Sequence, residues 1–342
     1  VTVVSSAGDI SREVRETADF VPIPMARAIS PRADLQSVRD LAGLLRRVRP
    51  DVVVGGTPKA GLVSMVAART ARVPTRVLQA RGARWDGLAG RQRRLLIAAD
   101  RFAASNATHT LAVSDSLADL MVEAGAARRR PIVLGAGGSK GVDRTIFHPA
   151  VERVPDLQRP RLGFLGRLTP DKGVADALQV LDVLEAEGRS PRLDVVGKPD
   201  DAHPVGADVM ARVTADPRVD HYQDLAPKEV ADLLREWDLL VFPSHREGLP
   251  NAVIEAAACG VPTVGYRTTG VVDAVRPGRT GTLVALADTK GLSNAASDLL
   301  REPNHAAARA ASEQWAGAFD AALVTEQFVR FLAEANRQSV RA

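Results

Sequence analysis

The stretch LLVFPSHREGLPNAVIEAAACGVPTVGY, residues 239–266, holds the pattern that decides the fold. It begins with a short apolar run, 239–242, and ends with another, 261–266, and both have the length of buried strands. Between them, Pro250 suits the first position of a helix, because proline has no N–H to leave unpaired there. Strand, helix and strand in this order predict a parallel α/β unit. Glu247 then lies in the loop at the carboxyl end of the first strand, where such sheets bind ligands.

The same alternation runs along the whole chain. Strands are expected at 2–5, 51–54, 76–79, 110–113, 132–134, 161–165, 193–196, 219–222, 239–242, 261–266 and 282–284. Helical periodicity is expected at 35–48, 62–72, 91–104, 116–124, 288–313 (two helices) and 319–337. The proline-rich segment 149–160 interrupts the series and is interpreted as a linker. The fold class is therefore α/β, with two tandem Rossmann-like doubly wound domains, 1–150 and 151–318.

Length and composition are those of a globular protein. The chain has 342 residues, enough for two hydrophobic cores, with 45% hydrophobic and 25% charged residues. It has no run of 18 apolar residues, and its first residues lack the pattern of a secretory signal. The single cysteine, Cys259, has no partner for an internal disulfide and stands among small residues typical of close helix packing. We expect a protein of the reducing cytoplasm.

Charge is divided unevenly along the chain. Residues 1–150 hold 23 Lys and Arg against 13 Asp and Glu, whereas the remaining residues hold 22 against 28. The excess is concentrated in three arginine clusters, at 46–49, 91–94 and 128–130. A basic first half favours an anionic partner, such as the inner face of the cell membrane or a lipid diphosphate. The alternative is that these arginines are ordinary solvated helix residues.

Two cations flank the first turn of the second domain. The segment GRLTPDKG places Arg167 directly after a strand that ends at Gly166, and Lys172 follows five residues later. Arg can hold two phosphate oxygens at once, Lys supplies a mobile point charge, and a helix start adds partial positive charge. The segment lacks the P-loop pattern. It predicts a diphosphate site, with ordinary surface charges as the alternative.

Two carboxylates accompany residues 239–266. Glu247 precedes Gly248, where the backbone can approach a ligand closely, and the amides near Leu249 and Asn251 lie at a helix start. Glu255, inside the helix, can accept hydrogen bonds from a vicinal diol such as ribose. Glu247 can accept them from sugar hydroxyls and favours positive charge at a neighbouring carbon. The alternative is that both are structural partners of nearby arginines.

Three motifs together resemble the donor half of a known enzyme family. GRLTPDKG (166–173), HREGLPNAVIEAAACGVPTVG (245–265) and GRTGTLV (278–284) resemble retaining family 4 glycosyltransferases of the GT-B fold, the group 1 glycosyl transferases. The resemblance implies two Rossmann-like domains that face each other across a cleft. It also implies that the second domain holds a nucleotide-sugar donor, that the anomeric configuration is retained, and that a C-terminal helix, 319–342, completes the first domain.

The resemblance also implies roles for individual residues. Arg167 and Lys172 would clamp the diphosphate, Glu247 would bind sugar hydroxyls, and these three would carry the reaction. The full donor-binding set it implies is Gly166, Arg167, Lys172, Gly197, Glu247, Gly248, Leu249, Pro250, Asn251 and Glu255.

The first half resembles a narrower group. GGTPKAG (55–61), ARGARWDG (80–87) and VLGAGGSKGVDRTIFHP (133–149) look like bacterial enzymes that build cell-surface polysaccharide on a polyprenyl diphosphate. The residues this implies for the acceptor side are Thr57, Lys59, Arg81, Arg84 and Ser139, and His245 is the candidate site histidine beside Glu247. The opening VTVVSSAGD resembles the second strand of these relatives, so we expect that a first strand is missing.

The expected reaction moves a hexose or N-acetylhexosamine from a nucleotide-diphosphate sugar, preferably a UDP-sugar, to a polyprenyl-diphosphate-linked or saccharide acceptor. No Asp-x-Asp run is present, so no metal or other cofactor is expected. Two alternatives are a glycolipid transferase of the phosphatidylinositol type and an enzyme like UDP-N-acetylglucosamine 2-epimerase. A nucleic-acid partner is disfavoured, because aromatic residues for base stacking make up 4% of the chain.

Overall fold

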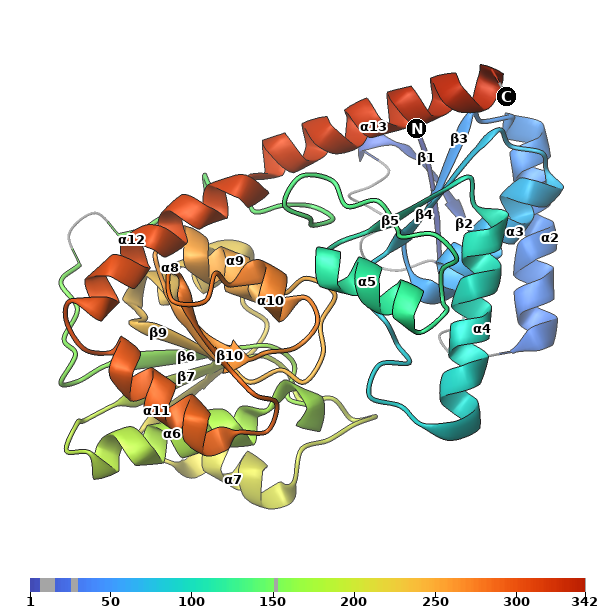
Figure 1. The fold of residues 1–342 in the computed structure, drawn as a ribbon. Coiled ribbons are helices and arrows are strands. Elements are labelled where there is room, and N and C mark those ends of the chain that lie inside the picture. The colour runs from blue at the N-terminus through green and yellow to red at the C-terminus, as the bar shows by residue number, and fades with distance from the viewer. Residues whose placement is uncertain (7–15, 26–29, 151–152, 342) are drawn as a thin grey trace. The chain divides into compact units, whose positions relative to one another are not determined.

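The computed structural model describes residues 1–6, 16–25, 30–150 and 153–341, and within them the chain forms two compact units (Figure 1). The first unit comprises Val1–Val113, Ala118–Val133 and Phe328–Ala342; the second comprises Ser114–Leu117 and Leu134–Gln327. Each unit has its own parallel strands and its own core, and each is described by itself.

The first unit is a parallel α/β structure. Its strands are β1 (Thr2–Ser5), β2 (Asp19–Pro22), β3 (Val52–Gly55), β4 (Thr75–Ala80) and β5 (His109–Ala112). β1 pairs with β2, and a three-stranded sheet has the order β3-β4-β5. Its helices are α2 (Pro31–Val48), α3 (Pro58–Thr70), α4 (Gly90–Asn106) and α5 (Asp115–Glu123), of which α5 begins in the residues grouped with the second unit.

The C-terminal helix α13 (Ala321–Arg341) contributes its last turns to the first unit. Thr75 Oγ1 donates a hydrogen bond of 3.0 Å to Asn336 Oδ1. The ring of Phe331 meets His109 edge to face, with the centroids 5.6 Å apart. These contacts fix the end of the helix to strands β4 and β5.

The second unit is built on a six-stranded sheet. Its strands are β6 (Arg161–Leu165), β7 (Arg192–Val196), β8 (Val219–Tyr222), β9 (Leu239–Phe242), β10 (Thr263–Tyr266) and β11 (Gly281–Val284), in the order β11-β10-β9-β6-β7-β8. All pairings are parallel. Its helices are α6 (Val174–Ala186), α7 (Ala207–Ala215), α8 (Pro227–Glu236), α9 (Asn251–Ala258), α10 (Val271–Ala274), α11 (Thr289–Leu299) and α12 (Asn304–Ala316), with 3-10 turns η1 (Pro170–Lys172) and η2 (Gly317–Phe319).

Helices cover both faces of this sheet. α6 and α11 lie on one face, and α8 and α9 on the other (Figure 1). On the face covered by α8 and α9, the Trp237 ring lies directly against β6. A Cβ at Gly163 would stand 1.9 Å from this ring, so only glycine leaves room for the indole there. Trp237 Nε1 then donates to Asp194 at 2.7 Å, and Arg161 pairs with the same carboxylate.

The predicted α/β class with parallel sheets is confirmed, and three local details differ. The strand β2 was not anticipated, because its Asp-Phe-Val-Pro run ends in proline, which weakens a strand signal. The strand expected at 132–134 is reduced to a bridge between Ile132 and Leu111. Pro250 is extended and caps α9 instead of occupying its first turn, with its carbonyl accepting from Val253.

Residues 134–150, expected in the first domain, group with the second unit. Val142 exchanges backbone hydrogen bonds with Phe319 and Ala321, at 2.8 and 3.0 Å. Val142 and Phe147 are buried in the core that includes Trp237.

None of the helices within the described ranges is long and apolar enough to cross a membrane.

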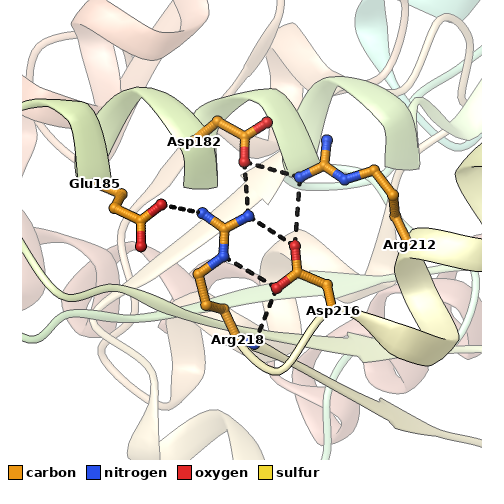
Figure 2. Close-up of polar contacts among 5 residues, drawn as sticks. All are labelled: Asp182, Glu185, Arg212, Asp216 and Arg218. Atoms are coloured by element: carbon orange, nitrogen blue, oxygen red, sulfur yellow. Dashed lines mark hydrogen bonds and ion pairs between the residues drawn. The ribbon is translucent and has the colours of Figure 1, made fainter.

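An ion-pair network joins α6, α7 and the start of β8 (Figure 2). Arg218 pairs with Asp216 at 2.6 Å, with Asp182 at 2.8 Å and with Glu185 at 2.6 Å, while Arg212 pairs with Asp182 at 2.8 Å. The hydrogen bond from Arg218 is the largest cause that holds the pKa of Asp216 well below its usual range.

We expect Asp216→Asn to lower the free energy of unfolding by about 1 kcal/mol at pH 7, because it removes charge-assisted hydrogen bonds near the surface. The folded-state pKa is depressed, so the contribution is present above the unfolded value of about 3.9 and is lost as pH falls below it. Urea unfolding of both proteins should therefore give a difference that is constant from about pH 7 to about pH 5 and shrinks as the pH falls below about 4. Asp201→Asn, at an exposed position, is the matched control; an equal loss from it would contradict the assignment.

Candidate functional site

The site lies where the direction of the sheet order reverses. From β6 the chain adds β7 and β8 on one side, and then returns to add β9, β10 and β11 on the other. β6 and β9 are neighbours, with Leu162 opposite Leu239. Their carboxyl ends thus meet at a topological switch point, which is the usual ligand position in open α/β sheets.

The loops that follow these two strands bring Lys172 and Glu247 together. Lys172 Nζ lies 2.5 Å from Glu247 Oε1, and their side chains are 15% and 18% exposed. Ser244 Oγ donates to the same carboxylate oxygen at 2.9 Å. Lys172 Nζ also lies 3.4 Å from Ser244 Oγ and 3.5 Å from the Arg246 carbonyl. Among the described residues, Glu247 Oε2 accepts no hydrogen bond, so the carboxylate has an unused acceptor.

The two loops are also tied together by Asp171. Its carbonyl accepts the His245 amide at 2.9 Å, and its carboxylate accepts Arg246 Nε at 3.2 Å. Burial acts to raise the pKa of Asp171, but hydrogen bonds from Thr169 and Arg246 and the charge of Lys172 outweigh it and the pKa is lowered. Asp171 is therefore an ionised anchor beneath the Lys172–Glu247 pair.

The predicted His245 does lie beside Glu247 in the chain, but its ring turns toward Tyr266, at a centroid distance of 5.9 Å. Burial is the first cause that raises the pKa of Tyr266, followed by its 2.9 Å hydrogen bond to Asp176.

The segment Gly248–Asn251 leads from Glu247 into α9. Gly270 packs directly against the backbone of this segment. Its φ is +75°, and a Cβ there would stand 2.4 Å from the Gly248 carbonyl oxygen. The same carbonyl accepts a hydrogen bond of 2.6 Å from the buried hydroxyl of Ser114, a residue that groups with this unit. The first amides of α9 have no intrahelical acceptor and carry the positive end of the helix dipole.

Glu255 lies in α9, and its side chain is 15% exposed. Lys140 Nζ approaches it at 3.6 Å. Burial raises the pKa of Glu255, and the charge of Lys140 opposes that rise. The loop that carries Lys140 also brings Gly138 close to the Leu249 side chain. Ser139, predicted on the acceptor side, therefore belongs to a loop that packs beside the predicted donor residues.

Arg167 is not part of this cluster of contacts. Its guanidinium is 63% exposed and lies 2.5 Å from Asp200, in the loop after β7. The backbones of these two loops touch, since a Cβ at Gly197 would stand 1.9 Å from the Gly166 carbonyl oxygen. The predicted donor-site residues Gly166 and Gly197 thus lie where these two loops meet. The two predicted phosphate ligands pair with different carboxylates, Arg167 with Asp200 and Lys172 with Glu247.

The four candidates in the first unit have local partners. The Thr57 hydroxyl caps α3 by accepting the Ala60 amide at 3.3 Å. Lys59 pairs with Asp34 at 2.7 Å. Arg81 donates to Gln79 Oε1 at 3.0 and 3.2 Å. The charge of Arg84 opposes the burial that raises the pKa of Asp100. None of these contacts tests the predicted role of the four residues in binding the acceptor, which stays a prediction.

Sequence reasoning missed Ser114, Ser244 and Lys140. Ser244 was within the quoted stretch, and a hydroxyl three residues before Glu247 was a usable signal. Ser114 and Lys140 lie more than a hundred residues from their partners, so nothing local indicated them.

In the part of the chain that the structure describes, no group of three or more His, Cys, Asp or Glu residues is arranged so that it could hold a metal ion. Cys259 is buried, and burial raises the pKa of its thiol to about 12. The thiol is therefore protonated at neutral pH and is not a nucleophile.

Comparison with known proteins identifies both halves. Residues 159–302 match the model "Glycosyl transferases group 1" and residues 1–137 match "Glycosyl transferase 4-like domain". The capsular polysaccharide biosynthesis glycosyltransferase CapM of Staphylococcus aureus is 30% identical over 312 residues, 88% of this chain and 80% of CapM. A D-inositol 3-phosphate glycosyltransferase of Mycolicibacterium paratuberculosis is 31% identical over 54% of this chain, which spans 45% of that relative. The crystal structure of Anabaena HepE in complex with UDP and glucose superposes with a TM-score of 0.77 at 18% identity, covering 97% of this chain and 91% of HepE.

We expect Lys172 and Glu247 to stabilise each other in the ligand-free protein. In a double-mutant cycle of Lys172→Met and Glu247→Gln, urea unfolding should give a coupling of about 1–3 kcal/mol, because a half-buried charge is left unpaired in each single variant. The pair Arg167–Asp200, whose arginine is 63% exposed, is the control and should show a smaller coupling. Equal coupling energies in the two cycles would contradict the prediction that the Lys172–Glu247 pair contributes more to stability than the Arg167–Asp200 pair.

Proposed function

The chain belongs to the group 1 glycosyltransferases, and on this premise we propose that it transfers a hexose or N-acetylhexosamine from a UDP-sugar to a polyprenyl-diphosphate-linked or saccharide acceptor with retention of configuration. The observation that carries the proposal is the Lys172–Glu247 pair, which joins the loop after β6 to the loop that leads into α9 at the switch point. It supplies a cation for phosphate and a carboxylate for hydroxyls within one contact.

In this proposal Lys172 keeps one N–H on Glu247 and turns the other two toward the diphosphate. Arg167 releases Asp200 and adds a two-pronged contact to the same group. The amides at the start of α9 add partial positive charge. Together they stabilise the negative charge on the leaving diphosphate. This set contains no metal or other cofactor, which is part of the proposal.

Glu247 and Glu255 hold the two sugars of the donor. The free oxygen of Glu247 accepts hydrogen bonds from hydroxyls of the transferred sugar, while Glu255 accepts them from ribose. The bond between the anomeric carbon and the diphosphate oxygen breaks, and the acceptor oxygen bonds to that carbon on the same face. The acceptor proton passes to an oxygen of the donor phosphate.

The nucleotide and the acceptor have support of different kinds. HepE, which shares the fold, is described in complex with UDP and glucose. CapM, which is similar over most of the chain, is described in capsular polysaccharide biosynthesis. A second candidate acceptor is an inositol phosphate or its lipid, because D-inositol 3-phosphate glycosyltransferases match about half of this chain. The site of action in either case would be the cytoplasmic face of the cell membrane.

We expect UDP to raise the melting temperature of the protein more than GDP or ADP, because a ligand that binds only the folded state stabilises it in proportion to its affinity. Lys172→Ala should weaken UDP binding about tenfold or more, since a phosphate loses a charge-assisted hydrogen bond. Isothermal titration with UDP measures this directly. Lys198→Ala, a surface lysine beyond Gly197, serves as the control. Wild-type UDP affinity in the Lys172 variant would refute the phosphate role.

Glu247→Gln should lower the rate of sugar transfer about a hundredfold while UDP affinity stays within about twofold, because the amide loses the charge that favours a cationic transition state. The amide oxygen can still accept the hydrogen bond from Ser244, so we expect the variant to fold, with the lower stability that loss of the Lys172 ion pair implies. Measuring kcat with a UDP-sugar and UDP affinity on one preparation separates the two effects. Wild-type turnover would exclude Glu247 from the site, and release of free sugar without acceptor would favour an epimerase instead.

A further inference from the structure

Both carboxylates of the predicted donor site have a lysine beside them, but the two lysines differ. Lys172 Nζ lies 2.5 Å from Glu247 Oε1, and the Lys172 side chain is 15% exposed. Lys140 Nζ lies 3.6 Å from Glu255 Oε1, and the Lys140 side chain is 64% exposed. A separation of 3.6 Å allows attraction between the charges but is longer than a normal hydrogen bond of about 2.7–3.2 Å. Lys140 therefore balances the charge of Glu255 without taking a hydrogen-bond position on its oxygens.

The loop that carries Lys140 is fixed on both sides of this residue. Before it, Gly138 has φ +104°, and a Cβ there would lie 3.8 Å from Leu249 Cδ2. After it, Gly141 has φ +67°, and a Cβ there would lie 2.7 Å from the Phe319 carbonyl oxygen. Glycine adopts such φ values readily, so the backbone makes these approaches without strain. The backbone at Lys140 is thus held in place, while its side chain stays exposed beside Glu255.

Little else around Glu255 stabilises a negative charge. Its side chain is 15% exposed, and no donor among the described residues lies within hydrogen-bond distance of its carboxylate. The strands β9 and β10, which precede and follow α9, hold no charged residue. Cys259, one turn further along α9, has a raised pKa and is uncharged at neutral pH. Ionisable side chains on the helices packed against α9 have their own partners: Arg235 of α8 pairs with Asp232, Asp273 of α10 accepts from Ser116, and His305 and Arg309 of α12 interact with Asp238.

We propose that Lys140 is a positioning residue for the donor nucleotide, which keeps Glu255 charged and leaves both carboxylate oxygens to the two hydroxyls of ribose. This inference rests on the proposed function, in which Glu255 binds ribose. A charged carboxylate accepts hydrogen bonds at both oxygens, whereas a protonated one presents a donor at one of them. Hydrogen bonds to the charged form are also stronger. Lys140 thus acts through Glu255 and does not itself have to touch the nucleotide.

A direct contact between Lys140 and a donor phosphate is the alternative role. A lysine that moved to a phosphate would leave the half-buried charge of Glu255 without its cation, which is costly. The two roles differ in their dependence on pH. They also differ in whether Lys140 still matters once Glu255 has been replaced by an uncharged residue.

The first experiment follows the ionisation of Glu255 in the ligand-free protein by NMR, with glutamate labelled by carbon-13 at the carboxyl carbon. The signal that Glu255→Gln removes is that of Glu255. Lys140→Met should move its titration midpoint up by about one pH unit, because an opposite charge within about 4–6 Å is lost, and Lys140→Arg should restore it. Lys290→Met removes the same charge from an exposed position on α11, on the opposite face of the sheet, and should leave the midpoint unchanged. An unmoved midpoint in Lys140→Met, or an equal shift in Lys290→Met, would overturn the proposal.

The second experiment measures UDP affinity by isothermal titration from about pH 8 to about pH 5. Burial raises the pKa of Glu255, so its charge is lost as the pH falls through that raised value, and without Lys140 it is lost at a higher pH. UDP affinity of the unmodified protein, divided by that of Lys140→Met, should therefore grow from about one to about ten as the pH falls. This ratio cancels the titration of UDP itself. A loss of equal size at every pH would indicate the phosphate contact and would overturn the proposal.

The last arm combines the two residues. Lys140→Met added to Glu255→Gln should cause no further loss of UDP affinity at any pH, and a further loss would show that Lys140 does not act through Glu255. Glu255→Gln should also lower the preference for UDP over 2′-deoxy-UDP. An unchanged preference would refute the ribose role in the proposed function, whereas an unmoved midpoint in the ligand-free protein refutes the role of Lys140 alone. The two failures are therefore distinguishable.

Discussion

The pairing of β6 with β9 is the constraint on which the site depends. These strands are 77 positions apart at the register Leu162–Leu239, yet they are neighbours in the sheet. Gly163 in β6 leaves room for the Trp237 ring beside this strand pair, since any side chain there would meet that ring. The β6–β9 pairing has a direct consequence for the site. It brings the loop with Lys172 beside the loop with Glu247, although each loop by itself carries only one of the two charges. A change that shifts this register would therefore separate a cation from a carboxylate without altering either residue.

The loop that carries Glu247 is held from several directions. Asp171 ties it to the loop after β6, Thr268 donates to the Ser244 carbonyl at 3.0 Å, and Gly270 and Ser114 support the Gly248 carbonyl. Each contact is modest, but together they leave the carboxylate few alternative positions. Preorganisation of this kind removes part of the ordering cost that a ligand would otherwise meet on binding.

Sequence patterns predicted most of the second sheet because its central strands contain short apolar runs next to glycine, proline or charged residues. The strands at Arg161–Leu165, Val219–Tyr222 and Leu239–Phe242 have the expected bounds. That Lys172 and Glu247 belong to one site was expected only from the resemblance to the donor half of family 4 glycosyltransferases. Contacts that depend on distant parts of the chain did not: Lys140 approaches Glu255 across 115 positions, and the grouping of residues 134–150 with the second unit rests on hydrogen bonds to Phe319 and Ala321. Such contacts are set by packing and leave no local pattern.

The Lys172–Glu247 contact has a consequence for selectivity. In the ligand-free protein the lysine already has a counter-ion, so an anion must compete with Glu247 for it and gains little from charge alone. A small inorganic anion offers nothing in exchange for the weakened ion pair. A molecule that carries phosphate next to hydroxyls can engage the lysine and at the same time donate hydrogen bonds to the carboxylate. If the pair binds the donor as proposed, free phosphate should therefore be a weaker ligand than a molecule that carries both groups.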